Sequence, residues 1–319
     1  MSTPAARIPL LVLGGFLGAG KTTLLNHLLS QTAPETDGLR WLAMVNDFGE
    51  INLDATLIAQ QHADTMALTN GCVCCSIGGD LSQALIQALA RRPLPEAIVI
   101  EASGVSDPWR VAQIGMAASE IALDGVVVVV DAATVLDHAA DPMLSDTLSR
   151  PLAHADLVVI NKTDVVDAAH LAAVNEWLDG HNAKARRWPT AQAQVPLALL
   201  SSAALRPPST HADCPDCNGH GDHEHHHDHS VHHDQQFITW QAQPTQTLDE
   251  AELSARIQAL PRHILRIKGL VKTERGWREL QFAGSKVRFR QAQAPSQAQL
   301  IAIGLRQASP ANPFDAVLS

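Results

Sequence analysis

The segment from Gly15 to Thr22, GFLGAGKT, fits the phosphate-binding pattern G-x-x-x-x-G-K-[ST]. In such a loop the glycines let backbone N–H groups close around phosphate, Lys21 reaches the outer phosphates and the threonine hydroxyl can ligate Mg2+. An apolar run over 8–13 precedes the loop and a helical pattern over 23–29 follows it, which is the context that this loop requires. The sequence therefore predicts a site for a nucleoside triphosphate.

A carboxylate and a glycine lie close together after another apolar run, which ends at Ile100. The Glu101 carboxylate can hold the Mg2+ shell, directly or through water. The Gly104 N–H can contact the γ-phosphate and so respond to hydrolysis. We therefore expect Lys21, Thr22 and Glu101 to be the groups that act on the triphosphate.

The tetrapeptide Asn161-Lys162-Thr163-Asp164 follows a further apolar run. The Asp164 carboxylate can accept two hydrogen bonds from the N1 and N2 donors of guanine, a pair that adenine lacks, and such a contact discriminates by about 1 to 3 kcal/mol or more. Taken alone, N-K-x-D is more often a helix N-cap than a base reader. Its place one strand beyond the acidic motif favours guanine, so we expect GTP rather than ATP. The contacts to the base would come from Asn161, Lys162 and Asp164.

Three cysteines in four residues, Cys72, Cys74 and Cys75, lie between two of the apolar runs. Thiolates select soft or borderline ions such as Zn2+, Cu(I) or Co2+. Because Cys74 and Cys75 are adjacent and point in different directions, we expect two of the three to bind one ion. Other ligands would come from elsewhere, such as Asp47, Glu50 or a histidine, and an open shell suits a site that releases its metal. The alternatives are buried structural cysteines or a redox pair.

The composition changes sharply over 206–236 to Pro, Asp and His, with eight histidines between His220 and His233. Such a tract has almost nothing apolar to bury, so we expect a disordered linker. Closely spaced imidazoles chelate Zn2+, Ni2+ or Co2+ in many alternative sets, and Cys214 and Cys217 have C-x-x-C ligand spacing. We favour a low-affinity metal store, and the alternative is a solvated spacer.

The elements that must position these motifs are apolar runs alternating with helical patterns up to about residue 205. Near-continuous Val, Ile and Leu runs separated by helices indicate strands of a parallel sheet that is buried on both faces. This predicts an α/β P-loop NTPase fold with a doubly wound, mostly parallel sheet. Ligands of such sheets gather at the carboxyl ends of the strands, which is where the motifs lie. The expected strands span 8–13, 41–45, 97–100, 125–130, 157–160 and 195–199.

The chain is expected to have three parts. These are a P-loop GTPase domain over 1–205 that carries the C-x-C-C motif, the His-rich linker over 206–236, and a smaller α+β domain over 237–319. In the last part we expect one helix near 248–260, opened by Asp249. Its expected strands span 237–240, 263–267, 286–290 and 300–303, and no catalytic motif is visible there.

The composition narrows the class of protein further. A formal charge of -10 and a pI near 5.8 argue against a general nucleic-acid binder, which would carry a basic surface. The segment from Met1 to Pro9 lacks the apolar core of a signal peptide, and no apolar run approaches the roughly 20 residues that span a bilayer. Five cysteines in two close clusters suggest thiolate ligands in a reducing compartment rather than disulfides. We therefore expect a cytoplasmic protein that contacts neither nucleic acid nor membrane.

The phosphate loop, the cysteine cluster and the motifs that begin at Glu101 and Asn161 have the order and spacing of those in the CobW-like metallochaperone GTPases, relatives of UreG and HypB. The chain resembles this family. The chain departs from the family pattern at Asp47, where members often have Glu, and at Gln299, where they often have Arg. The resemblance covers nearly the whole chain and rests on the phosphate loop and on the segments 46–50, 70–75, 101–104, 161–164 and 265–269.

The resemblance implies a protein that loads a divalent metal, with zinc as the favoured cargo, and passes it to a client apo-metalloenzyme under control of GTP. Close variants are cobalt (Co2+) delivery for cobalamin synthesis or for nitrile hydratase, and the alternative is a GTP-binding metal sensor or buffer that delivers to no enzyme. Whether the chain is a monomer or a dimer stays open. The implied Mg2+ ligands are Thr22 and Glu101, and the implied cargo ligands are Cys72, Cys74 and Cys75. The implied phosphate contacts are Gly15, Gly18, Ala19, Gly20, Lys21, Thr22 and Thr23.

Overall fold

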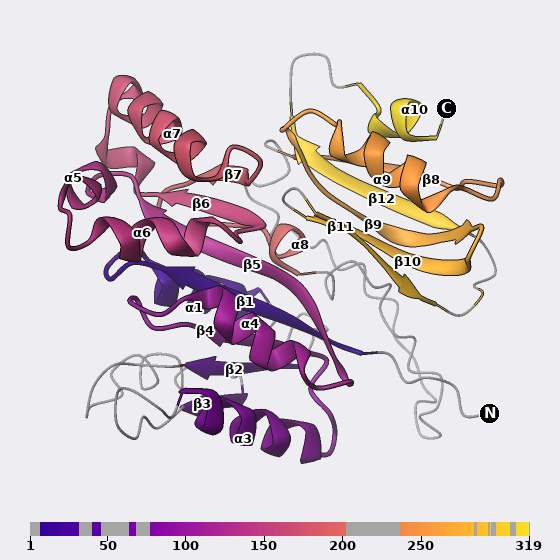
Figure 1. Cartoon of the computed structure of the whole chain (residues 1–319), viewed down its shortest axis with the longest axis horizontal. Helices are drawn as coiled ribbons and strands as arrows, with labels where there is room; N and C mark the ends of the chain where they lie inside the picture. Colours follow the sequence, from indigo (N-terminus) through magenta and orange to yellow (C-terminus); the bar gives the residue numbers. More distant parts are fainter. Residues whose placement is uncertain are drawn as a thin grey trace, which may run out of the picture.

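The computed structural model describes residues 7–31, 40–45, 64–67, 77–201, 237–283, 286–292, 294, 298–306 and 311–318. These residues form a larger unit that ends at Ser201 and a smaller one that begins at Phe237, each built on its own sheet (Figure 1). The C-x-C-C cysteines and the His-rich tract lie outside the described residues.

The larger sheet has seven strands, all parallel, in the spatial order β3-β2-β4-β1-β5-β6-β7. Strands β1, β4, β5 and β6 are buried along their whole length, which explains their uninterrupted apolar sequences. The predicted parallel α/β sheet is therefore confirmed. The strands are β1 (Ile8–Gly15), β2 (Trp41–Val45), β3 (Asp64–Ala67), β4 (Ala97–Glu101), β5 (Ile121–Asp131), β6 (Leu157–Asn161) and β7 (Arg186–Pro189).

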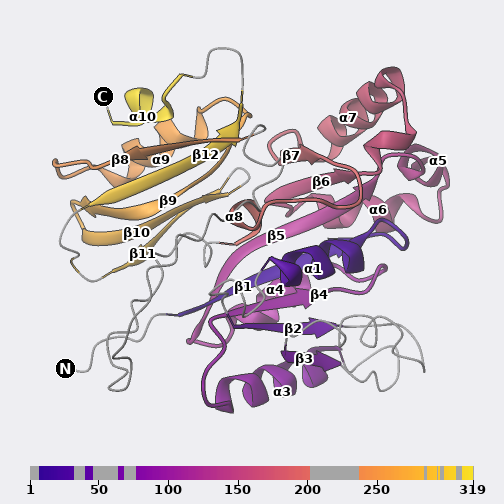
Figure 2. The same cartoon turned by 180° about the vertical axis from the view of Figure 1, so that it is seen from behind.

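Helices cover both faces of this sheet (Figure 2), so the fold is doubly wound as predicted. One face packs against α1 and α8, and the other packs against α3 to α7. No helix within the described ranges is long and apolar enough to cross a membrane. The helices are α1 (Lys21–Ser30), α3 (Ile77–Ala90), α4 (Pro108–Met116), α5 (Val135–Ala140), α6 (Ser145–Leu152), α7 (Ala168–Asn182) and α8 (Leu197–Leu200).

The smaller unit is an antiparallel sheet of five strands in the order β11-β10-β9-β12-β8. Helices α9 (Glu250–Gln258) and α10 (Pro313–Val317) pack on one face of it. The Asp249 side chain caps α9 by accepting from the Glu252 N–H, as the sequence predicts. The strands are β8 (Phe237–Ala242), β9 (Ile264–Thr273), β10 (Gly276–Ala283), β11 (Lys286–Gln291) and β12 (Gln299–Leu305).

An extra residue in β5 turns one carboxylate toward the smaller sheet. Strand β5 pairs with β1 through Leu123 and again from Gly125 onward, so Asp124 is a β-bulge between them. The bulge shifts the alternation of side chains, because Leu123 and Val126 both enter the apolar cluster that includes α3 to α7. Bulges re-aim side chains in this way. The Asp124 carboxylate consequently leaves the regular pattern of the strand and is 1% exposed.

Three side chains converge on this carboxylate. Arg266 of β9 donates to Asp124 Oδ1 at 2.6 Å, and Gln281 of β10 donates to the same oxygen at 2.7 Å. The hydroxyl of Ser201, at the end of the larger unit, donates to Oδ2 at 2.8 Å. Because all four residues are buried, this network joins the two units.

Strand β11 contacts the same edge of the larger sheet. The Arg288 guanidinium lies 3.3 Å from the Asp156 carboxylate, which immediately precedes β6. Arg290 donates to the carbonyl of Leu123, near the start of β5, at 2.8 Å. The smaller unit therefore docks at the amino ends of the parallel strands, and their carboxyl ends point away from it (Figure 1).

One predicted strand is wrong. The segment 195–199 is not a strand, because Leu197–Leu200 forms the short helix α8, which Pro196 precedes in an extended conformation. The last strand of the larger sheet is instead β7, at the edge, which the sequence patterns did not predict. The patterns also miss β3, β10 and α10, so the smaller unit has two helices in its described part rather than one.

Candidate nucleotide-binding site

The predicted phosphate loop joins the buried strand β1 to helix α1. Gly20, at the helix N-terminus, has φ 106° and ψ 25°, a left-handed conformation that glycine adopts without strain. A Cβ at this position would collide with the side-chain nitrogen of Asn161. Within the loop, Lys21 Nζ donates to the Phe16 carbonyl at 3.1 Å, which holds the ammonium over the loop itself. The backbone N–H groups of this helix end form an anion-binding geometry.

The predicted acidic partner lies beside the loop. Thr22 Oγ1, in the first turn of α1, donates to Glu101 Oε1 at 2.9 Å. The two side chains come from sequence positions 79 residues apart and meet because β4 and β1 are neighbours in the sheet. Glu101 is 4% exposed. The hydroxyl and the carboxylate are both oxygen ligands of the kind that Mg2+ prefers.

The segment after β4 also contacts the phosphate loop. The N–H of Ala102 donates to the Leu13 carbonyl at 2.8 Å, which extends the pairing of β4 with β1 by one bond. A Cβ at Gly104 would lie 2.9 Å from the backbone nitrogen of Leu17. Glycine is thus required for close approach of this segment to the loop. The acidic motif and the phosphate loop form one structural unit.

The predicted base-reading motif is tied to the same loop. The Asn161 amide donates to the Ala19 carbonyl at 2.9 Å, and its oxygen accepts from the Ala193 N–H at 2.8 Å. Asn161 is 3% exposed. The residue therefore bridges the phosphate loop and the loop that precedes α8, rather than pointing freely to solvent. Of the other predicted residues, Asp164 and Thr23 are exposed.

Sequence reasoning missed Asp131, which ends β5. Its Oδ2 lies 2.6 Å from Lys162 Nζ, and its Oδ1 accepts from the Ala133 N–H at 2.9 Å. Lys162 itself has a left-handed backbone with φ 61°. Asp131 could have been found from its position in the sequence. Like Glu101, it is an acidic residue at the carboxyl end of a buried strand.

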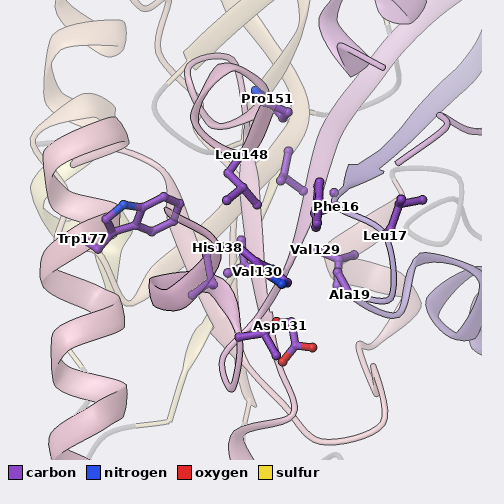
Figure 3. A pocket seen from close by; sticks show the side chains of 14 residues that line it. Phe16, Leu17, Ala19, Val129, Val130, Asp131, His138, Leu148, Pro151 and Trp177 are labelled. Carbon is purple, nitrogen blue, oxygen red and sulfur yellow. The ribbon is translucent and has the colours of Figure 1, made fainter. Parts of the chain in front are cut away.

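A cavity lies next to the phosphate loop, on the face that α5 to α7 cover. Figure 3 shows Phe16 and Leu17 of the loop on one side of it and Leu148 and Trp177 on the other. Asp131 lies at its lower end in this view. The lining is mostly apolar, and its polar side chains are Asp131, Thr134 and His138.

The residues expected to bind the cargo metal lie outside the described part of the chain. Cys72, Cys74 and Cys75 lie outside the described residues, as do Asp47 and Glu50. Among the residues that the structure does describe, no group of three or more His, Cys, Asp or Glu side chains could hold a metal ion.

Comparison with known proteins finds two domain families along the chain. Residues 9–188 match the CobW/HypB/UreG nucleotide-binding domain, and residues 237–318 match the C-terminal domain of the cobalamin synthesis protein CobW. The first match covers the phosphate loop, the acidic motif and the N-K-x-D motif, and the second covers the smaller sheet.

Individual proteins are similar to much or nearly all of the chain. A Sinorhizobium protein named zinc chaperone CobW is 31% identical over 303 residues, which cover 82% of this chain and 81% of the relative. The Escherichia coli zinc chaperone YjiA is 34% identical over 202 residues, 60% of each protein. A crystal structure of a Zn(II)-bound triple mutant of YjiA GTPase covers 98% of this chain and 97% of its own at 19% identity, with a TM-score of 0.45. Because this TM-score is below 0.5, the fold is identified by the strand order β3-β2-β4-β1-β5-β6-β7 and not by this likeness.

Proposed function

Because the chain belongs to the CobW/HypB/UreG family, we propose that it is a GTP-dependent metallochaperone that loads zinc and passes it to client apo-metalloenzymes as GTP is hydrolysed. The chain is a P-loop GTPase. The names of its curated relatives support zinc as the cargo. The observation that carries the proposal is the 2.9 Å contact of Thr22 with Glu101, together with the 2.9 Å bond of Asn161 to the phosphate loop.

We assign the triphosphate to the α1 end of the site. Backbone N–H groups of the loop and the Lys21 ammonium would neutralise the phosphates, and the Gly104 N–H would contact the γ-phosphate. The full set of phosphate contacts in this proposal is Gly15, Gly18, Ala19, Gly20, Lys21, Thr22, Thr23 and Gly104. Electrostatic stabilisation and positioning supply most of the rate in phosphoryl transfer, so these groups carry the catalysis.

We assign the base to the loop after β6. The Asp164 carboxylate is exposed and free to meet the N1 and N2 donors of guanine, while Asn161 fixes the loop from beneath. The salt bridge to Asp131 fixes the Lys162 side chain, which would lie beside the base. The hydrogen bond from Asn161 to the Ala19 carbonyl fixes the distance between the phosphate loop and the base loop. This favours a ligand whose base and phosphates are separated by that distance.

Thr22 and Glu101 fit a hydrated Mg2+ ion. Both present oxygen atoms, they are already 2.9 Å apart, and they lie at the end of the loop that faces the outer phosphates. When bound, Mg2+ supplies positive charge to the β- and γ-phosphate oxygens. The protein's own contribution would be to orient these oxygens through Lys21 and to hold the Glu101 carboxylate beside Thr22.

The metal cargo is proposed to bind at Cys72, Cys74 and Cys75. The segment 46–75 lies between the phosphate loop and Glu101, where a GTPase carries its switch elements. A γ-phosphate that orders this segment would bring the thiolates into metal-binding geometry, and hydrolysis would release the ion. By linkage, metal and GTP must raise each other's affinity by the same factor.

We propose that the three parts of the chain have different roles. We propose a GTPase domain over 1–205, a linker over 206–236 that stores metal at its histidines, and a C-terminal domain over 237–319. The C-terminal domain docks at the amino ends of the strands, opposite the nucleotide. Among the described residues, the C-terminal domain therefore leaves the nucleotide edge uncovered, and we propose that a client docks there.

A competitive titration tests the proposal. Zn2+ and Co2+ are added to the full chain with Mg2+ and either GTP or GDP, and the same titration is repeated with Cys72→Ser/Cys74→Ser. Zinc binding that is tighter with GTP than with GDP, and that is lost in the double variant, is the expected result. The GTPase rate of the double variant without added metal should equal that of the parent chain.

Other outcomes point elsewhere. A preference for Co2+ at the same thiolates would identify a cobalt donor. Metal binding that is equal with GTP and GDP and is unchanged in the double cysteine variant would contradict control of metal binding by GTP. It would indicate a metal buffer.

A further inference from the structure

One buried hydroxyl beside the phosphate loop has no hydrogen-bond partner among the residues that the structure describes. Ser103 is 6% exposed, and its Oγ contacts no donor or acceptor within the described part of the chain. Its own carbonyl accepts from the Ser106 N–H at 2.9 Å, so the backbone is satisfied while the side chain is not. A buried hydroxyl without a partner costs about 1 to 3 kcal/mol, and such groups need an explanation.

The alternation along β4 gives the side on which Ser103 lies. Ile98, Ile100 and Ala102 enter the cluster that includes α3 to α7, whereas Val99 enters the opposite cluster, which includes α1. Ala102 still pairs with β1 through its N–H, so the extended course continues past the strand end. Ser103 therefore falls on the same side as Val99 and Glu101, the face of α1.

The neighbours of Ser103 are the groups already assigned to the outer phosphates. Two residues before it, Glu101 contacts Thr22, and directly after it Gly104 lies against the backbone of Leu17. In a phosphate loop, backbone N–H groups of the loop itself surround the α- and β-phosphates. A hydroxyl on the α1 side between Glu101 and Gly104 would therefore face the position of the γ-phosphate.

We propose that Ser103 Oγ donates a hydrogen bond to the γ-phosphate of bound GTP. The inference rests on the proposed function and deepens it, because it adds a side chain that distinguishes GTP from GDP. The γ-phosphate supplies the acceptor that the hydroxyl lacks within the protein. GDP leaves the hydroxyl without that acceptor, so Ser103 contributes to the free-energy difference between the two nucleotide states.

The test is the ratio of nucleotide affinities of Ser103→Ala and the parent chain. Dissociation constants for GDP and for a non-hydrolysable imido analogue of GTP are measured by calorimetry on the full chain with Mg2+. A hydrogen bond to a charged acceptor predicts that affinity for the analogue falls about 10-fold to 100-fold, while affinity for GDP changes less than about twofold. Ser103→Thr keeps the hydroxyl and should restore discrimination. Ser106→Ala removes a nearby hydroxyl and is the matched control.

Three results would overturn the inference. They are an equal loss for both nucleotides, no loss for either, and the same pattern in Ser106→Ala. The melting temperature of the nucleotide-free Ser103→Ala protein should equal or exceed that of the parent, because the change removes an unpartnered hydroxyl, and a large decrease would indicate a structural role. If the parent chain itself binds neither nucleotide, the proposed function fails; if the parent discriminates and Ser103→Ala still does, only this inference fails.

Discussion

The Asp124 carboxylate of β5 and the Arg266 guanidinium of β9 form a buried ion pair that joins the two units, with Oδ1 and Nη2 2.6 Å apart and side-chain exposures of 1% and 3%. The bulge in β5 presents the carboxylate, and Gln281 and Ser201 satisfy its remaining acceptor positions. Arg266 also donates to the Leu199 carbonyl at 3.0 Å, so the end of α8 is held by the same guanidinium.

Asp124→Asn should destabilise the protein strongly. It leaves the Arg266 charge buried without a counter-ion, and breaking a buried pair in this way costs about 3 to 5 kcal/mol. Urea denaturation should show the loss as a lower free energy of unfolding. The double variant Asp124→Leu/Arg266→Met should recover most of it. Arg150→Ala, which breaks the exposed pair with Asp146, is the control and should cost less than about 1 kcal/mol.

Asp131→Asn should weaken GTP and GDP alike. The change breaks the salt bridge that holds Lys162, which lies at the base end of the proposed site, so both nucleotides lose the same contact. Because Lys162 is 40% exposed, the loss should be only about twofold to fivefold. Fluorescence titration with both nucleotides measures it, and Asp137→Asn on α5 is the control. A loss confined to GTP would contradict this placement of the base.

Gly104→Ala should impair GTP binding more than folding. The new Cβ would press on the backbone nitrogen of Leu17 at 2.9 Å and push the acidic segment away from the phosphate loop. We expect at least a 10-fold loss of GTPase activity. Gly180→Ala, a helical site where an added Cβ meets nothing within 4 Å, should keep full activity and gain about 0.5 to 1 kcal/mol of stability. Equal effects of the two changes would refute the steric argument.

His263 should make stability depend on pH. Burial, together with the nearby Arg186 guanidinium, lowers the pKa of His263 below its usual 6.5. The unfolded chain therefore binds this proton more readily, so stability is highest above pH 6.5 and decreases as the pH falls below 6.5 towards and through the lowered pKa of the folded state. Melting temperatures of His263→Gln between pH 5 and 7.5 should vary less than those of the parent. His181→Gln controls for the removal of an imidazole elsewhere.

Removal of residues 211–233 should lower the number of bound Zn2+ ions without abolishing GTP hydrolysis. The deleted tract holds most of the histidines of the chain and none of the proposed nucleotide contacts. Atomic absorption after dialysis gives the metal content, and phosphate release gives the rate. A loss of hydrolysis would count against a storage role.

The strand, glycine loop and helix that carry Gly15 to Thr22 could be predicted from the sequence because they depend on local patterns. A phosphate loop needs glycines at fixed spacing, and a doubly buried strand such as β6 needs an unbroken apolar run. The Asp249 cap is equally local. Asp131 belongs to no sequence motif. Its importance comes from Lys162, which lies 31 residues away in the chain and directly after the neighbouring strand β6.

The secondary-structure predictions are wrong where tertiary contacts determine which element forms. The segment V-P-L-A-L-L is apolar and short, and periodicity alone cannot separate a buried strand from a buried helical turn. Strand β7 carries two arginines, which argue against an inner strand. One of them, Arg187, pairs with Asp179 at 2.8 Å, and the other, Arg186, packs on the Phe282 ring of the smaller unit at 5.1 Å. Neither partner can be read from the sequence of the strand.

Asp124 and Arg266 are 142 residues apart in the chain, so the carboxylate is synthesised long before its counter-ion. Until the ribosome has made Arg266, the Asp124 carboxylate has no counter-ion at this site, and an unpaired carboxylate resists burial. Leu265 and Ile303 of the C-terminal sheet share an apolar cluster with α1 and α8, so burial of this surface of the GTPase domain also depends on that sheet. Docking of the C-terminal sheet therefore removes a charged group and an apolar surface from water, and exposed apolar surface promotes aggregation of newly made chains.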